Sequence, residues 1–487
     1  MSPRGKKRCG PDPRVLSLLR VLLATLAVLS LAPLAMVIAV RAQSTAIDPG
    51  VRGGKVNAGG FISGLTTNQA ALEGTTSNNF VEIVSVTGTI TGNSGLGPRY
   101  NSDQCSKCHA QPAIGGVTGF SNNFFLVYDE EGALNYMPFF ESQTGPAMNA
   151  RFPLQLTNTS LPDGQVHQLF TITGRTDAAN CELDQPNFSQ ASSESPPAGA
   201  SDLTSNLSFR VPLPLFGDGL VEIIRNADIL SNQAVECAAQ ASTGICGTAS
   251  YAPDGSINRF GWKAQNRSLL IFAGEAYNVE MGVSNEQFPN ETDETVGCAA
   301  ESLIPAGQTA PLGIPEDHET FVNPSAHRFS GDPERFALFM RFLAPPVPGV
   351  TNSITMMGQT EFNSVGCNIC HTTSFTTPPS VIGALGNFQA NLFSDLLLHH
   401  MGPCLADGES VGVAQGDMFR TPPLWGVGQR IFFLHDGRTT DIVQAVEDHF
   451  CADNATYPAS EANNVINSFN ALSATNQQDL IDFVRSL

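Results

Sequence analysis

Hydrophobic and polar positions set residues 1–42 apart from the rest of the chain. This segment begins with Arg and Lys and continues as an apolar run from Val15 to Val40, interrupted by Arg20 and Pro33. A basic start, an apolar run and a small-residue site at 40–42 are typical of a secretory signal peptide. Because the run is also long enough to span a bilayer, an N-terminal membrane anchor is the alternative. In either case we predict that residues 43–487 are exported, to the periplasm or a similar compartment.

The pattern is irregular in the first half of the exported part. Residues 43–100 are rich in Gly, Thr, Asn and Ser, and only Phe80–Val86 alternates in a way that predicts a strand or a half-buried extended segment. Residues 180–205 are polar and rich in Ser and Pro, which predicts a surface insertion. The proline-rich segment Ala344–Pro348 predicts a stiff linker. We therefore place a domain boundary there, between 43–345 and 346–487.

The second half has the 3.6-residue period of helices. Helical patterns cover 360–366, 387–400 and 439–450. In the last of these, Ile442, Val446 and His449 fall on one face. The final helix is predicted to begin at a capping box, Thr475–Gln478, and its apolar stripe runs to Leu487. These patterns predict a mainly α fold.

The composition excludes some classes of partner. The 487 residues are enough for more than one domain, and 41% of them are hydrophobic, so we expect a packed core. Only 14% are charged, and 25 Lys+Arg against 45 Asp+Glu give a net charge of −20. An acidic surface repels nucleic-acid phosphates and anionic lipids. We therefore expect no nucleic-acid partner, and membrane contact only if the leader is retained, whereas a cationic protein partner is compatible with this charge.

Two copies of one short motif carry the candidate chemistry. They are Cys105-Ser106-Lys107-Cys108-His109 and Cys367-Asn368-Ile369-Cys370-His371. C-x-x-C-H is the attachment signature of c-type haem, in which the two thiols add to the porphyrin vinyl groups and the His becomes the proximal iron ligand. A zinc site would need a second pair of ligands close by, and a thioredoxin-like motif does not require the His. The sequence therefore predicts two covalently bound haems, with His109 and His371 on the irons.

Six further cysteines lie in the exported part, and an oxidising compartment favours disulfides among them over free thiols. Only Cys404 and Cys451 lie beyond the proline linker, so within one domain each is the natural partner of the other. The remaining four then pair most simply as Cys237–Cys246 and Cys181–Cys298.

The chain resembles the di-haem oxidoreductase family, whose members are described as peroxidases or thiol oxidoreductases. The family is related to bacterial di-haem cytochrome c peroxidases and to the enzyme that matures methylamine dehydrogenase. The resemblance extends from residue 95 to residue 487, and its matching stretches occur in the following order: Gly95–Asn101, Phe216–Glu222, Arg259–Ala264, Glu280–Asn285, Leu396–Gly402, Arg420–Gly426 and Phe433–Arg438. It implies two cytochrome c-like haem domains, the first enlarged by loops and short strands. In such proteins one haem takes electrons from a donor protein or small cytochrome, and the other reacts with peroxide or another small oxidant.

The resemblance also suggests which residues act near the haems. His449 lies in the helix where the relatives carry the distal ligand of their second haem, often a Met, so we expect it on the iron opposite His371. His399 and Met401 are rival ligands, and a core histidine bonded to a backbone carbonyl is the alternative interpretation of His449. Glu280 resembles the glutamate near the peroxidatic haem, although a surface acid would show the same pattern.

Four other histidines and one tryptophan have weaker assignments. We expect His435, in a His-Asp-Gly turn, to make a structural hydrogen bond, and His167, His318 and His327 to lie at the surface. Trp262 is a candidate electron relay between the haems, with core packing as the alternative.

Together these observations predict an exported di-haem c-type oxidoreductase that resembles cytochrome c peroxidase. The first haem is expected to be the reactive one, because no His follows His109 until His167. The alternative is a non-catalytic di-haem electron carrier, in which both irons have two firm axial ligands. A third possibility, modification of a partner protein, is suggested only by the methylamine dehydrogenase relative.

Overall fold

A computed structural model of the protein describes residues 44–87, 95–155, 158–163, 166–188, 206–290, 292–293, 295, 298 and 331–487. The predicted leader and most of the predicted insertion at 180–205 lie outside these residues. Within the described ranges, no helix has both the length and the apolar character needed to cross a membrane.

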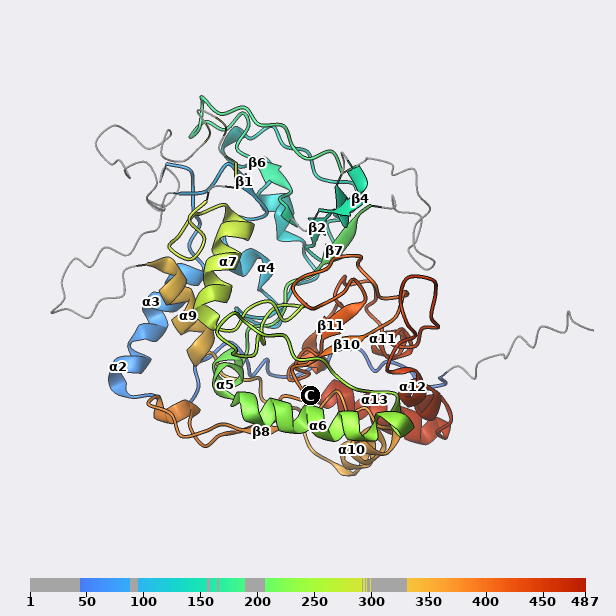
Figure 1. Ribbon diagram of the computed structural model, residues 1–487. Helices are drawn as coiled ribbons and strands as arrows, with labels where there is room; N and C mark the ends of the chain where they lie inside the picture. Colours follow the sequence, from blue (N-terminus) through green and yellow to red (C-terminus); the bar gives the residue numbers. More distant parts are fainter. Residues whose placement is uncertain are drawn as a thin grey trace, which may run out of the picture. The chain divides into compact units, whose positions relative to one another are not determined.

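Helices are distributed along the whole described chain (Figure 1). The α-helices are α2 (Thr67–Ala70), α3 (Leu72–Phe80), α4 (Cys105–Cys108), α5 (Asp218–Ile223), α6 (Asn226–Thr243), α7 (Leu269–Met281), α9 (Asp332–Phe342), α10 (Ser353–Val365), α11 (Ile442–Glu447), α12 (Asn463–Asn470) and α13 (Ala474–Ser486). Short 3₁₀ helices cover Asn123–Leu126, Glu130–Gly132, Gly383–Leu385 and Val427–Gln429.

The strands are short and pair only in small antiparallel sheets. They are β1 (Arg99–Tyr100) with β6 (Phe170–Thr171), β2 (Asn149–Arg151) between β5 (Val166–His167) and β7 (Ser208–Arg210), β3 (Leu154–Gln155) with β4 (Asn158–Pro162), β8 (Phe375–Thr376) with β9 (Gln389–Ala390), and β10 (Leu398–His400) with β11 (Met418–Arg420). The prediction of a mainly α fold is not confirmed. With 45 Gly and 32 Pro in the chain, many segments cannot continue as helices and connect the elements as loops.

In the first half, α9 packs against both α3 and α7, and Figure 1 shows the three helices side by side. Phe80, at the end of α3, stacks on Phe339 of α9 with ring centroids 4.4 Å apart. Phe80 is the last residue of α3, Val81 lies in a turn, and residues 82–86 form no named strand.

The C-terminal end of α7 is held against the segment that precedes the first motif. A Cβ atom at Gly97 would lie only 2.2 Å from the carbonyl oxygen of Gly282, and Gly282 itself has a φ of +71°. Only glycine allows this approach. As a result, the backbone N–H groups of Asn101 and Ser102 donate to the carbonyl oxygen of Glu280 over 2.8 and 3.0 Å. The two glycines thus bring Glu280 next to the first motif.

In the second half, α10 packs along α13 and leads directly into the second motif. The final helix begins at Ala474 with Ser473 as its N-cap, one residue before the predicted start, and its predicted stripe is buried. The 439–450 helix is shorter than predicted and covers only α11.

The predicted helix at 387–400 is wrong. This segment forms β9 and β10, which pair with β8 and β11, and Asn387, Phe393 and Leu396 adopt positive φ angles that a helix cannot contain. Pairing with distant strands overrides the local helical pattern.

The described cysteines confirm the predicted pairing. Disulfides join Cys181 to Cys298, Cys237 to Cys246, and Cys404 to Cys451. The described cysteines outside these bonds are the four of the two motifs.

Two hydrophobic cores surround the two motifs, and each includes residues from both halves of the chain. The first contains Leu396 and Trp425 from the second half, and the second contains Ile245 from the first half. Residues 44–487 form one compact unit. The boundary at 345–346 stays a prediction.

Candidate haem sites

The first motif forms one helical turn, α4, followed by His109. The ring Nδ1 of His109 lies 2.9 Å from the carbonyl oxygen of Gly116. Because a carbonyl only accepts, Nδ1 carries the proton, and the lone pair of the neutral ring is on Nε2. Burial lowers the pKa of His109, so the ring stays neutral and able to bind a metal. A Cβ atom at Gly116 would lie 1.9 Å from the backbone oxygen of Gln111, so this position requires glycine.

The second motif repeats this geometry. The backbone N–H of His371 donates to the carbonyl oxygen of Cys367 over 2.9 Å, as His109 donates to Cys105 over 3.1 Å. The Nδ1 atom of His371 lies 3.0 Å from the carbonyl oxygen of Phe393. Burial lowers the pKa of His371 to about 4. Both histidines are thus neutral and present Nε2.

Each motif lines a cavity, and the residues present fit a c-type haem. The first cavity has a volume of about 620 Å³ and includes Cys105, Cys108 and His109 in its wall. The second has a volume of about 200 Å³ and includes Cys367, Cys370 and His371. Two free thiols and one histidine with an available Nε2 are the donor set that such a haem requires. His109 and His371 would hold the iron.

Glu280 lies half-buried in the wall of the first cavity, which the surface-acid alternative did not anticipate. One carboxylate oxygen accepts a 2.8 Å hydrogen bond from the side-chain amide of Asn101, and the other accepts one of 2.5 Å from that of Asn149. Burial raises the pKa of Glu280, and the two amides oppose this shift. A carboxyl group in this position holds its proton more tightly than an exposed glutamate does.

The short strand β2 contributes a second residue to this cavity. Side chains two positions apart on a strand point to the same side, so Arg151 lies on the same side of β2 as Asn149. Both line the cavity. No sequence pattern pointed to Arg151 or Asn149, because their significance depends on Glu280, which is distant in the chain. Asn101, in contrast, belongs to a stretch that carried the family resemblance.

Trp262 lines both cavities. Its indole N–H donates to the carbonyl oxygen of Val211 over 2.8 Å, and its ring lies 6.3 Å from that of His435. Trp262 thus borders both cavities, and its role as an electron relay stays a prediction.

His449 lines the second cavity together with His371. Its Nδ1 atom lies 2.7 Å from the carbonyl oxygen of Ala445, and burial lowers its pKa. The carbonyl bond expected of a core histidine is therefore present. The same bond leaves Nε2 available, as in His109 and His371, so the geometry is compatible with ligation.

His399 has both ring nitrogens engaged by carboxylates. Nε2 lies 2.7 Å from Asp395, and Nδ1 lies 2.8 Å from Glu461. Burial would lower the pKa of His399, but Cys370 and Asp395 raise it well above 6.5. With both ring nitrogens bonded to carboxylates, His399 presents no free nitrogen in the described arrangement, and its role as a rival ligand stays a prediction. The other rival, Met401, lines the second cavity.

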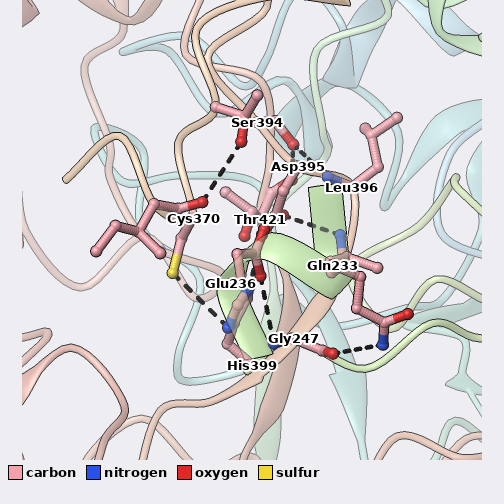
Figure 2. A network of polar contacts seen from close by, with 12 residues as sticks. Gln233, Glu236, Gly247, Cys370, Ser394, Asp395, Leu396, His399 and Thr421 are labelled. Atoms are coloured by element: carbon pink, nitrogen blue, oxygen red, sulfur yellow. Dashed lines mark hydrogen bonds and ion pairs between the residues drawn. The ribbon is translucent and has the colours of Figure 1, made fainter. Parts of the chain in front are cut away.

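Figure 2 shows the sulfur of Cys370 pointing toward the His399 ring, at 3.7 Å from Nδ1. Cys370, Asp395 and His399 are close enough for their donor atoms to share a metal ion. Because Cys370 belongs to a haem motif and His399 is bonded on both sides, we interpret the cluster as a buried ion pair. It borders the attachment site of the second haem.

The remaining histidines differ partly from expectation. His435 is buried in the wall of the second cavity, where its ring stacks on Phe419 at 4.3 Å, and its backbone carbonyl accepts from Val211. His167 is half-buried rather than at the surface, because it lines the first cavity and bonds Asp163 over 3.0 Å. His318 and His327 lie outside the described residues.

Comparison with known proteins places the chain in a family. No curated protein matches the sequence. Among solved structures, hydrazine synthase of Kuenenia stuttgartiensis matches at 19% identity over 33% of this chain and 56% of its own, with a TM-score of 0.20. A MauG-like protein associated with microbial copper homeostasis matches at 15% identity over 34% of this chain and 55% of its own, with a TM-score of 0.24. The chain thus spans little more than half the length of either structure. The family model described as "Di-haem oxidoreductase, putative peroxidase" matches residues 158–487, more than half of the chain, and the protein therefore belongs to the di-haem oxidoreductase family.

Proposed function

We propose that the protein is an exported di-haem c-type peroxidase, which reduces hydrogen peroxide in the first cavity with electrons that enter at the second haem. The overall reaction consumes two electrons and two protons per peroxide and releases two water molecules. One observation carries the proposal. The first cavity contains a half-buried carboxyl group with a raised pKa, Glu280, whereas the second contains a further histidine with an available Nε2, His449.

The residues of the first cavity supply proton transfer. Cleavage of the O–O bond requires a proton on the departing oxygen, and a carboxyl group with a raised pKa can both donate and recover a proton. Asn101 and Asn149 hold the two oxygens of Glu280, so the group acts from a defined position. A haem bound through Cys105, Cys108 and His109 would supply the redox chemistry.

The residues of the second cavity suit electron transfer. A haem held by both His371 and His449 would supply electron transfer with little rearrangement, because two firm protein ligands would hold its iron. Trp262, which borders both cavities, is then the most direct route for electrons between them. The net charge of −20 favours a cationic electron donor, such as a small cytochrome. Three disulfides support export.

The test combines spectroscopy and turnover in one anaerobic redox titration of the holoprotein. We expect one high-spin and one low-spin haem in a state that turns over peroxide. Two low-spin haems that do not react with peroxide in any redox state would instead identify an electron carrier.

The Glu280→Gln variant tests the acid–base role. Peroxide turnover should fall roughly a hundredfold or more, with both haems retained, since Gln cannot transfer the proton. Glu275→Gln is the matched control, because Glu275 lies on the same helix and lines the same cavity but is bonded by Asn266. Unchanged turnover in Glu280→Gln removes this residue from the mechanism.

A further inference from the structure

Arg151 lies in the wall of the first cavity. Its Nε atom is buried and has no hydrogen-bond partner, and no ion pair joins its guanidinium group to any described residue. Burial lowers the pKa of Arg151 to about 10, which still leaves it charged at neutral pH. Burying a charge is costly unless an opposite charge compensates it.

The neighbouring carboxylates attract Arg151 without pairing with it. Glu409, Asp407 and Glu280 favour its charged form, but within the described residues none of them forms an ion pair with its guanidinium group. Arg210, which faces Asn149 across the β2–β7 pair, is bonded to Asp407 over 2.6 Å, and Lys263 bonds the other oxygen of Asp407 over 2.9 Å. The two oxygens of Glu409 make no hydrogen bond, not even to Arg151. Burial raises the pKa of Glu409 to about 7.

The ion pairs of this group occupy the nearest ionised carboxylate. Asp407 is shared by Arg210 and Lys263, and Glu409, whose pKa burial raises to about 7, is partly protonated near neutral pH. His167 also lines the cavity, but it is bonded to Asp163. Glu280 is held by Asn101 and Asn149 and makes no bond with Arg151.

We propose that Arg151 binds an anionic oxygen inside the first cavity. A guanidinium group presents several N–H donors in a plane, which suits a carboxylate or a small oxyanion. Two sources have this chemistry, a propionate group of the haem and a small anion that enters from solvent. The inference rests on the haem occupancy proposed above but not on peroxide turnover.

The test uses azide as the anionic probe, titrated optically into the ferric holoprotein at constant ionic strength, together with the midpoint potentials of both haems. If the anion comes from solvent, Arg151→Gln should weaken azide binding at the first haem at least tenfold, and Arg151→Lys should retain most of the affinity. If the anion is a propionate, the midpoint potential of the first haem should fall in Arg151→Gln, because a compensating positive charge is lost. Azide affinity then stays unchanged, or azide does not bind even to the wild type.

Arg267→Gln is the matched control, because this arginine is half-exposed and paired with Asp254 on the surface. Arg267→Gln should change neither the azide affinity nor the midpoint potential of the first haem. The second haem should keep its midpoint potential in every variant. If Arg151→Gln does not accumulate, Arg151→Met, which keeps much of the length without the charge, repeats the test. The proposal is overturned if removing the charge changes neither azide affinity nor the potential of the first haem, or if Arg267→Gln has the same effect. A wild type that lacks peroxide turnover but shows the Arg151 effect would contradict the peroxidase function and leave the anion site intact.

Discussion

The two haem motifs share a local geometry but have different surroundings. In both, the histidine after the second cysteine is held through Nδ1 by a backbone carbonyl and presents Nε2. The first cavity, of about 620 Å³, then offers a carboxyl group and an arginine whose Nε has no hydrogen-bond partner, whereas the second, of about 200 Å³, offers another histidine in the same tautomer. The short motif thus sets the local arrangement of two thiols and a histidine, and residues distant in the chain set the chemical surroundings of each cavity.

The largest expected effect is the loss of one haem at a time. Denatured, acid-treated protein should keep two haems, because thioether bonds survive this treatment. The paired variant Cys105→Ser/Cys108→Ser should keep only the low-spin haem, and Cys367→Ser/Cys370→Ser only the peroxide-reactive one. Mass spectrometry and the pyridine haemochrome spectrum measure both. One haem or none in the wild type contradicts covalent attachment at both motifs.

Opening the second cavity should make it resemble the first. His449→Ala removes the proposed second ligand of the haem at His371, so the low-spin spectrum should convert to high-spin, and added imidazole should restore it. His435→Gln is the control, since this ring lines the same cavity but stacks on Phe419. A spectrum that stays low-spin without His449 would assign the ligand to another residue, with Met401 the first candidate.

Variants that lack one disulfide should show which bond affects only the free energy of unfolding and which also affects iron ligation at the second haem. Cys404 and Cys451 are separated by 47 residues, and Cys181 and Cys298 by 117. Replacing the first pair by Ala should lower the free energy of unfolding by about 4 kcal/mol, and replacing the second by about 5 kcal/mol. Only the Cys404–Cys451 variant should also loosen low-spin ligation at the second haem, because Cys451 lies two residues after His449. Urea unfolding and the optical spectrum measure the two effects. Equal spectral changes in both variants would refute a specific role of the second bond.

The smallest effect concerns pH and the buried ion pair beside the second haem. Burial and the nearby Asp395 raise the pKa of Glu236 from 4.5 to about 8. The folded state therefore binds this proton more tightly than the unfolded chain. The corresponding stability is complete below about pH 4.5 and is lost as the pH rises toward about 8.

In the wild type, the free energy of unfolding should fall by on the order of 1.4 kcal/mol per pH unit, and by a few kcal/mol at most in total. Glu236→Gln should flatten this dependence. Thermal unfolding between pH 5 and pH 8 measures it, and the exposed Glu73→Gln provides the baseline. The same slope in both variants would show that Glu236 does not hold the proton.

The hydrophobic pattern predicted a helix correctly where tertiary packing buries the same residues. It failed where hydrogen bonds to other strands determine the secondary structure. The helix before the second motif and the buried stripe of α13 follow from periodicity. The segment 387–400 has a helical pattern as well, but hydrogen bonds to β8 and β11 make it two strands. That segment carries both Asp395 and His399, so the ion pair beside Cys370 could not be anticipated from a helix.

The sequence by itself determined two features, the donor atoms that lie within a few residues of one another and the number of cysteines available for disulfides. Each C-x-x-C-H motif supplies two thiols and a histidine within five positions, and six cysteines divided by one proline linker have one simple pairing. Tertiary structure alone decided which carboxyl group, arginine and histidine face each motif. Glu280, Asn149 and Arg151 meet at the first cavity from α7 and β2, and both ring nitrogens of His399 are bonded by Asp395 and Glu461. The physical reason is that attachment follows from covalent spacing, whereas protonation, charge and ligation depend on contacts between segments far apart in the chain.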